Sequence, residues 1–388
     1  MKNWITYNLA DICKNIYSGG TPSTKHPEYW GGNLKWLSSG ETSQKFIYDT
    51  QRKITEAGVN NSSTKLAHKN SVVIATAGQG YTRGQVSFLM TDTYMNQSVI
   101  ACQPDERKVL PLYLYYNLDS RYAELRLLSD GTSTRGGLSG RILKKMEILL
   151  PSIEEQSKIV AMLYSLDKKV EINESINKNL EEQAWSVFSK YYDAAESQSK
   201  FTALIDVLGG GTPKTNTPDF WNGSIPFFTP KDVGMPYTFH TEKHLTKAGL
   251  EHCNSKLYPK NTTFVTARGT VGKISLAGIP MAMNQSCYAL ISKKINPILV
   301  YFYVHKAVNS LKHKASGAVF DAIVTRDFDT ETLNVLDKND SRTVLSVIEP
   351  IMGAIHTNSE NNIYLSNLKN YLIPKLMSGD IDVSNIDL

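Results

Sequence analysis

GGTPSTKHPEYWGG, which begins at Gly19, returns later in the chain as GGTPKTNTPDFWNG, which begins at Gly210. A second block, Met-Asn-Gln-Ser, occupies residues 95–98 and again residues 283–286. The copies are 191 residues apart at the first block and 188 at the second. A period this long, with a small drift, is typical of a duplicated domain that has lost a few loop residues. The sequence therefore predicts two homologous domains in one chain.

The composition is that of a globular protein, with 41% hydrophobic and 10% aromatic residues among 388. No segment approaches the roughly 18 uninterrupted apolar residues of a membrane span, and the N-terminus lacks a signal-peptide core. The four cysteines show neither a metal-ligand spacing nor a disulfide framework, which fits a reducing compartment. We therefore expect a cytoplasmic protein with no membrane partner.

Charge alternates along the chain. Residues 1–150 carry 18 basic against 12 acidic side chains, and residues 199–336 carry 15 against 9. Residues 151–198 carry 5 against 9, and residues 337–388 carry 4 against 7. Basic domains attract a polyanion, whereas acidic segments would not lie along one. Ordinary variation of surface charge is the alternative reading.

Each basic half reads as mixed α/β. Short strand-like runs at residues 71–76 and 262–266 are bounded by turn residues. Aromatic-rich helices are expected over residues 110–127 and 297–314, each followed by a Gly loop, at residues 129–131 and 315–317.

The first acidic segment predicts one long helix over residues 152–192, about 60 Å in length. Ser152 and Glu155 form a capping box at its start. Apolar residues then alternate spacings of four and three, as in a coiled coil. The expected seam is Ile159, Leu163, Leu166, Val170, Asn173, Asn177, Leu180, Ala184, Val187 and Tyr191. The two asparagines either fix the register of the pair or contact a partner.

The second acidic segment repeats this pattern less cleanly. Leu345, Ile348, Met352 and Ile355 hold the spacing, which slips before Leu365, Leu368 and Leu372. Pro350 is expected to kink the helix or mark a restart, and the polar residues 358–362 are expected to interrupt the seam.

The predicted fold is α+β, with two homologous mixed α/β domains separated by two long antiparallel coiled-coil helices. Antiparallel pairing of the helices would make a dumbbell with a pseudo-two-fold axis. The expected segments are a domain at 1–150, a long helix at 151–198, a second domain at 199–336, a second long helix at 337–378 and a tail at 379–388.

Two Gly-rich loops, Thr76–Gly84 and Thr266–Lys273, follow corresponding strands and carry the strongest binding signals. Arg and Gln can read base edges with two hydrogen bonds, while Thr, Lys and backbone amides suit phosphates. The candidate DNA-binding residues on these loops are Gln79, Tyr81, Thr82, Arg83, Arg268, Thr270 and Lys273. Ordinary surface turns remain the alternative.

The Gly-Thr-Pro blocks are weaker candidates. They read as rigid turns with Trp30 and Trp221 packed beneath them, and Lys25 and Lys214 could reach phosphate. The Asn-Gln pairs look structural, with DNA contact as the alternative. No metal, nucleophile or phosphate-loop motif is complete, so no cofactor and no catalytic residue is expected.

The blocks GGTPSTKHPEYWGG, WLSSGE, TARGTVGK, MNQS, PSIEEQSKIV and LIPKLMSGDI together resemble the specificity (HsdS) subunits of type I restriction-modification systems, over essentially the whole chain. The resemblance implies two target-recognition domains that each read one half of an asymmetric, bipartite double-stranded DNA site. It implies that the helices set the unread gap and dock two adenine-N6 methyltransferase (modification) subunits. Restriction subunits would join them in the full complex, which would use S-adenosylmethionine and ATP.

Two other functions fit parts of the sequence. A stand-alone endonuclease with two recognition lobes would cleave DNA in magnesium by itself. A scaffold or decoy would bind methyltransferase subunits without DNA, and behaviour toward DNA that is insensitive to salt and blind to sequence would favour it, because a true reader should lose affinity steeply with salt.

Overall fold

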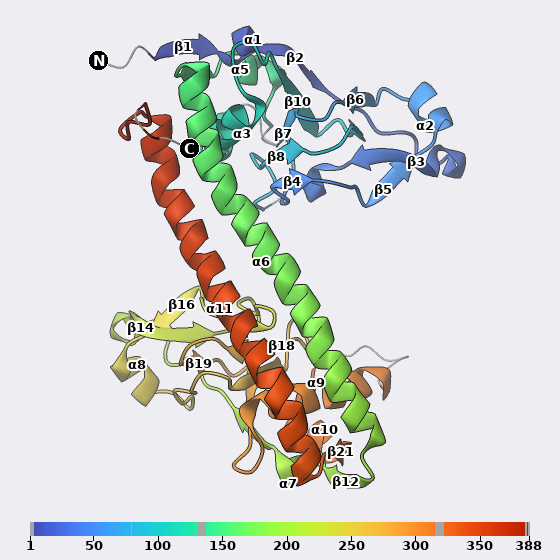
Figure 1. Ribbon diagram of the computed structural model, residues 1–388, viewed down its shortest axis with the longest axis vertical. Helices are drawn as coiled ribbons and strands as arrows, with labels where there is room; N and C mark the ends of the chain where they lie inside the picture. Colours follow the sequence, from blue (N-terminus) through green and yellow to red (C-terminus); the bar gives the residue numbers. More distant parts are fainter. Residues whose placement is uncertain (1–3, 79, 131–136, 315–321, 385, 387–388) are drawn as a thin grey trace. The chain divides into compact units, whose positions relative to one another are not determined.

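The structure, a computed structural model, describes residues 4–78, 80–130, 137–314, 322–384 and 386. The chain divides into two compact units. Unit 1 comprises Met1–Lys169 with Leu365–Leu388, and unit 2 comprises Val170–Tyr364. Each contains a five-stranded sheet, a smaller sheet and a two-stranded ribbon, so the predicted mixed α/β class of both domains is confirmed (Figure 1).

Unit 1 is built on a five-stranded sheet. In spatial order its strands are β2 (Cys13–Ser18), β10 (Val99–Pro104), β7 (Val72–Ala75), β8 (Val86–Leu89) and β4 (Phe46–Ile47). The smaller sheet has β5 (Arg52–Ile54), β3 (Trp30–Leu37), β9 (Thr93–Met95) and β6 (Lys65–Ala67), and β1 (Ile5–Asn8) pairs with β11 (Glu147–Leu150). Its short helices are α1 (Leu9–Ile12), α2 (Glu56–Asn60), α3 (Pro111–Asp119), α4 (Tyr122–Asp130) and α5 (Gly140–Lys144), with 3-10 turns η1 (Pro27–Tyr29) and η2 (Ser39–Glu41).

Unit 2 repeats this plan. Its five-stranded sheet has β13 (Asp206–Gly209), β20 (Cys287–Ile291), β17 (Thr263–Thr266), β18 (Ile274–Ala277) and β15 (Tyr237–Thr238). The smaller sheet has β16 (Lys243–Leu245), β14 (Trp221–Phe228) and β19 (Ala282–Met283), and β12 (Ser197–Lys200) pairs with β21 (Thr332–Val335). Its short helices and turn are α7 (Phe201–Leu204), α8 (Lys247–Glu251), α9 (Pro297–Lys314), α10 (Thr325–Asp329) and η3 (Pro218–Phe220).

The two five-stranded sheets have the same topology. In each, the middle strand pairs antiparallel with both neighbours, and the last strand pairs parallel. The central strands β7 and β17 are buried on both faces, which explains why they read as short apolar runs. This shared topology confirms the duplication.

The expected helix over residues 110–127 is wrong as a single element, because α3 ends at Asp119 and α4 begins at Tyr122. Between them, Arg121 donates a 2.8 Å hydrogen bond to the carbonyl oxygen of Glu147 on β11. That bond ties the backbone to a neighbouring strand at the point where α3 stops. The corresponding helix α9 keeps the predicted bounds, Pro297–Lys314. Of the Gly loops predicted after these helices, residues 129 and 130 are instead the last two of α4, while residues 131 and 315–317 lie outside the described residues.

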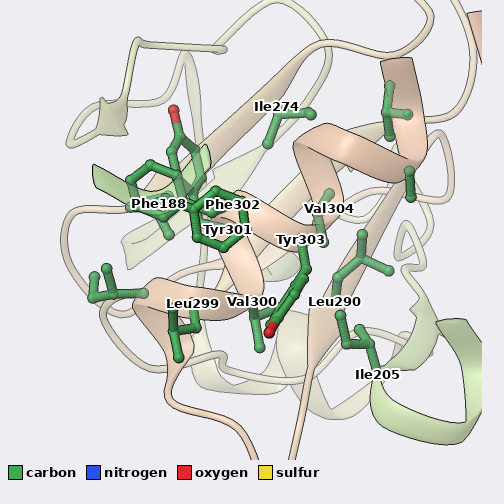
Figure 2. Close-up of a cluster of buried hydrophobic side chains, with 14 of the residues drawn as sticks. Phe188, Ile205, Ile274, Leu290, Leu299, Val300, Tyr301, Phe302, Tyr303 and Val304 are labelled. Atoms are coloured by element: carbon green, nitrogen blue, oxygen red, sulfur yellow. The ribbon is translucent and has the colours of Figure 1, made fainter. Parts of the chain in front are cut away.

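Helix α9 is the centre of the unit 2 core. Tyr301, Phe302 and Tyr303 are buried in succession, which requires neighbours on several sides of the helix. Figure 2 shows Phe188, from a long helix that precedes the sheets of unit 2, packed beside these rings. Its centroid lies 5.0 Å from that of Phe302, with the two ring planes tilted by 32°. Burial of this aromatic cluster anchors that part of the long helix to the core of unit 2.

Two long helices, α6 (Ile153–Ala194) and α11 (Lys338–Met377), confirm the predicted coiled-coil segments, with 42 and 40 residues. The capping box is present, since the Glu155 amide donates to the Ser152 hydroxyl and the Ser152 amide donates to the Glu155 carboxylate. In unit 2, Asn173 contacts Asn362 and Asn177 contacts Ser359, so residue numbers rise along one helix as they fall along the other. The pair is therefore antiparallel there.

The polar stretch of α11 continues the seam instead of interrupting it. Asn173, only 2% exposed, donates a 2.7 Å hydrogen bond to Oδ1 of Asn362. Asn177 donates to Ser359 Oγ and accepts a 2.9 Å bond from Asn358. The predicted interruption at residues 358–362 is therefore wrong, because these side chains meet polar partners on α6. Of the two readings left open for Asn173 and Asn177, pairing between the helices is confirmed.

The expected restart at Pro350 is also wrong, since α11 is helical from Lys338 to Met377. Proline removes the N–H that the Ser346 carbonyl would accept in a regular helix. Both residues are exposed, so that carbonyl faces solvent, where water satisfies it at little cost.

Unit 1 holds its part of the helix pair through a buried charge cluster. Asp167 accepts hydrogen bonds from Lys369 at 2.8 Å, from Lys45 at 3.0 Å and from the Tyr116 hydroxyl at 3.0 Å. Burial lowers the pKa of Lys369, against the opposing effect of the Asp167 carboxylate, and the Asp167 charge raises the pKa of Lys45 despite burial. Removing one partner would leave a buried charge uncompensated.

Candidate nucleic-acid interface

The three repeated motifs converge at one end of the five-stranded sheet. In unit 1, the Gly20 amide donates a 2.9 Å hydrogen bond to the carbonyl of Met95, which opens the Met-Asn-Gln-Ser block. The Thr76 amide, at the start of the Gly-rich loop, donates a 2.8 Å bond to the carbonyl of Ser98, which closes that block. The Gly-Thr-Pro loop and the Gly-rich loop are thereby joined through the block between them. We call this arrangement the motif cluster.

Unit 2 contains the same motif cluster. The Gly211 amide donates to the Met283 carbonyl at 3.2 Å, and the Ala267 amide donates to the Ser286 carbonyl at 2.8 Å. The equivalent bonds in the two units involve equivalent residues of the repeat. The repeated blocks are therefore the residues that hold the cluster together.

The paired glycines are explained by the closeness of this packing. A Cβ on Gly19 would lie 1.9 Å from the Met95 carbonyl oxygen, and one on Gly210 would lie 2.1 Å from the Asn284 carbonyl oxygen. No side chain fits at either position without moving the backbone. The double Gly of each block is therefore a packing requirement.

The Asn-Gln pairs serve the cluster, as the structural reading predicted. Asn96 accepts a 3.0 Å hydrogen bond from the Ser98 amide. The Gln97 side chain accepts a bond from Thr21 of the Gly-Thr-Pro loop at 2.5 Å, and Gln285 accepts the equivalent bond from Thr212. Each Thr-Gln pair fastens one exposed loop to the next.

The tryptophans lie under the Gly-Thr-Pro loops, as predicted. Trp30 donates from its indole nitrogen to the Ser23 carbonyl at 3.3 Å, and Trp221 donates to the Lys214 carbonyl at 3.1 Å. Lys25 and Lys214 have exposed side chains on these loops. Among the described residues neither ammonium has an ion-pair partner, so both are available to an anion.

The Gly-rich loops differ in length. In unit 1 the last hydrogen bond between the two strands joins the Ala75 amide to the Gln85 carbonyl, so the loop between them has nine residues, 76–84. In unit 2 the equivalent bond joins the Thr266 amide to the Lys273 carbonyl, so the loop has six, 267–272. From the sequence, the two loops are expected to begin at the equivalent residues Thr76 and Thr266. That equivalence is wrong by one residue, because the second loop is three residues shorter and its hydrogen bonds match Thr76 with Ala267.

The longer loop presents a phenol to solvent. Tyr81 is 83% exposed, while Thr82 and Arg83 are half-buried. Arg126 of α4 donates to the carbonyls of Gly80 at 2.9 Å and Arg83 at 3.3 Å. This brace holds the loop from beneath. Gln79, the fourth candidate on this loop, lies outside the described residues.

The shorter loop, with the residue that follows it, presents two basic side chains and a hydroxyl group to solvent. Arg268, Thr270 and Lys273 all have exposed side chains. Lys312 of α9 donates a 2.7 Å hydrogen bond to the Gly272 carbonyl, and burial lowers its pKa. Its role matches that of Arg126 in unit 1.

Sequence reasoning missed both braces, Arg126 and Lys312. The available signal was that each is a basic residue near the end of one of the two helices expected over residues 110–127 and 297–314, and that the two residues are 186 positions apart. Across the described ranges, no group of three or more His, Cys, Asp or Glu side chains could hold a metal ion. Across the same ranges, no helix is both long and apolar enough to cross a bilayer.

A protein-family model described as the type I restriction modification DNA specificity domain matches this sequence twice, over residues 1–182 and 198–365. The two matches coincide with the two copies of the motif cluster.

Similar proteins carry related descriptions. The type I restriction enzyme MjaIX specificity subunit of Methanocaldococcus jannaschii is 23% identical over 415 residues, which cover 99% of this chain and 95% of that protein. The EcoR124I/EcoR124II specificity subunit of Escherichia coli is 28% identical over 215 residues, covering 51% and 52%. The crystal structure of a type I restriction-modification S subunit from M. genitalium matches with a TM-score of 0.62 at 14% identity, covering 97% and 96%. At that identity the match shows the fold alone.

Proposed function

The chain belongs to the family of type I restriction-modification DNA specificity domains and is a specificity subunit, and from this we propose that each recognition domain reads one half of an asymmetric, bipartite DNA site. Specificity subunits are not catalytic, so the chemistry belongs to partner subunits. Methylation of adenine N6 would be performed by two modification subunits, and cleavage by restriction subunits in the full complex. The expected location is the cytoplasm.

One observation carries the proposal: the two motif clusters share their hydrogen bonds, yet the loops mounted on them differ. The loops have nine and six residues, with a phenol at Tyr81 in one and a guanidinium at Arg268 in the other. A shared scaffold with unlike exposed side chains is what two readers of different DNA sequences require.

The candidate contacts divide by chemistry. Arg268, and Gln79 and Arg83 in the first loop, suit base edges, because a guanidinium or amide can make two hydrogen bonds to one base. The ammonium and hydroxyl groups suit phosphates. Those candidates are Thr82, Thr270, Lys273, Lys25 and Lys214, with the Tyr81 phenol as a further contact.

The long helices would dock the modification subunits. Within unit 2, α6 exposes Ile172 and Ile176, each 43% exposed, and α11 exposes Tyr364 at 66%. Exposed apolar side chains on an acidic helix suit a protein partner better than a phosphate backbone. The gap between half-sites would be set by the length of these helices.

The experiment that tests the function is a methylome. The chain is co-expressed with its cognate modification subunit in a host free of adenine methylation, and modified adenines are mapped by sequencing. We expect one bipartite motif with a fixed gap, absent when this chain is omitted. Absence of methylation alongside a modification subunit shown to be intact would overturn the proposal in favour of a scaffold or decoy.

A further inference from the structure

A basic hollow lies beside the motif cluster of unit 1, with a volume of about 580 Å³. Strands β2, β6 and β10 and helix α5 form its walls. The lining residues are Ile16, Tyr17, Ser18, Lys65, Ile100, Gly140, Arg141, Lys144 and Lys145. The hollow lies entirely within unit 1.

Its charge is of one sign. Lys65, Arg141, Lys144 and Lys145 contribute four cations, and the described residues that line the hollow include no carboxylate. Within the described ranges none of the four forms an ion pair, so their charges are not neutralised by the fold. Burial, followed by the nearby charge of Asp92, raises the pKa of Tyr17, so that its phenol stays neutral at physiological pH. Such a hollow attracts an anion.

The hollow is continuous with the proposed reading surface. Ser18 on its wall directly precedes the double Gly of the Gly-Thr-Pro block. Ile100, on another wall, lies on β10 two residues after the Met-Asn-Gln-Ser block ends. The segment that leads into α5 is tied to the Gly-rich loop, because the Leu138 amide donates a 3.0 Å hydrogen bond to the Thr76 carbonyl. A duplex on the motif cluster would therefore bring phosphates to these cations.

The second copy keeps the scaffold of this region and two of its four cations, because Arg326 and Lys256 stand at the positions of Arg141 and Lys65, but it lacks the other two. Helix α10 corresponds to α5, because the Ile323 amide bonds the Ala267 carbonyl as Leu138 bonds Thr76. At the positions of Lys144 and Lys145, unit 2 has Asp329 and Thr330. Since the fold forms without these cations in unit 2, the fold does not require them in unit 1.

We propose that this hollow holds backbone phosphates of the DNA beside the first half-site. The inference rests on the proposed function and deepens it, because it assigns the first domain a stronger sequence-independent grip than the second, which has Asp329 and Thr330 in place of Lys144 and Lys145. The grip would position the duplex and add affinity without choosing bases.

The test replaces two lysines of the hollow with the residues that unit 2 has at the equivalent positions. The variant Lys144→Asp/Lys145→Thr installs the residues of the second copy. Its matched control is Lys294→Asp/Lys293→Thr, an adjacent exposed pair just beyond the far end of β20, which changes the net charge by the same amount. Each full-length chain is assembled with the modification subunit. Its affinity for a duplex carrying the mapped motif, and for a scrambled duplex, is then measured across a salt series.

We expect the Lys144/Lys145 variant to bind both duplexes roughly tenfold or more weakly. The salt dependence of its affinity should be flatter by about 0.9 for each phosphate that the variant no longer neutralises. The methylated motif should stay unchanged, and the control should keep the parental slope. The reciprocal variant Asp329→Lys/Thr330→Lys should steepen the slope.

An unchanged slope in a folded Lys144/Lys145 variant would overturn the phosphate site while leaving the proposed function intact. A slope equally flattened in the control would also overturn it, since net charge alone would then explain the effect. If the first variant does not fold, Lys65→Gln, on a strand on another wall, tests the same hollow. Failure of the parent to prefer the motif over the scrambled duplex would contradict the proposed function itself.

Discussion

Arg268 is the side chain whose removal best separates reading from folding. It is exposed on the six-residue loop, whose backbone is held by bonds that do not involve its guanidinium. We expect Arg268→Ala to change or abolish recognition at one half-site, at a cost of about 1–3 kcal/mol in discrimination at one base. Methylome mapping checks this. Equal loss at both half-sites would contradict the assignment, and Lys294→Ala, an exposed lysine beyond the far end of β20 in the same unit, is the control.

His305 makes the stability of unit 2 sensitive to acid. It lies between the rings of Trp185 and Tyr301, with centroids 5.1 and 4.5 Å away. Burial, with a smaller effect from Lys312, lowers the pKa of His305 to about 4. In the unfolded chain this histidine is protonated below about pH 6.5, whereas in the folded chain it is protonated only below about pH 4. Because the unfolded chain binds more protons in this range, stability is lost as the pH falls through it.

We expect the free energy of unfolding to fall by about 2 kcal/mol from this residue between about pH 7 and pH 5. His305→Leu should remove that part of the pH dependence. Urea unfolding followed by intrinsic tryptophan fluorescence, to which Trp185 contributes, measures it at both pH values. A variant with the parental difference between the two pH values would show that other groups cause the acid sensitivity.

At the scale of elements, the asparagine layer between α6 and α11 fixes how the helices pair. In Asn173→Leu, the half-buried side-chain oxygen of Asn362 loses its hydrogen-bond donor, which should cost about 1 kcal/mol. The double variant Asn173→Leu/Asn362→Leu should recover most of that loss, because no polar group is left unpaired. Urea unfolding measures both. Asn179→Leu, an exposed position on α6, should be near neutral, and a comparable loss there would point to helix propensity instead.

The elements that sequence could predict are those whose signals are local. The capping box at Ser152 and the seam of α6 are both read within one segment. The break between α3 and α4 depends on Arg121 reaching Glu147, 26 residues away. The continuity of α11 through its polar stretch depends on partners in α6. Neither partner is visible in a single segment.

The same distinction separates the parts of the candidate site. The loops could be located because each is anchored by a block that the chain repeats. The braces Arg126 and Lys312 act on backbone carbonyls about 40 or more residues away, and no motif marks them. The proposed base contacts use side chains that the two copies do not share, so repetition says nothing about them.

At the scale of the whole chain, the proposed function makes the two long helices a spacer whose length would set the gap between the half-sites. One added turn lengthens a helix by about 5 Å. We expect a chain with one turn added to both α6 and α11 to methylate a motif with the same half-sites and a different gap. The methylome of that variant reads both features at once. An unaltered gap would refute the spacer role.

The unequal loops, nine residues in one copy and six in the other, also give the proposed target a direction. A site read by two unlike domains is not a palindrome, so its two strands differ in sequence, and the methylated adenines of the two half-sites would lie on opposite strands. When such a site is replicated, one daughter duplex inherits the methyl group in the first half-site and its sister inherits it in the second. Sister chromosomes would thus present two chemically distinct substrates, and maintenance of the mark would require the complex to accept each of them.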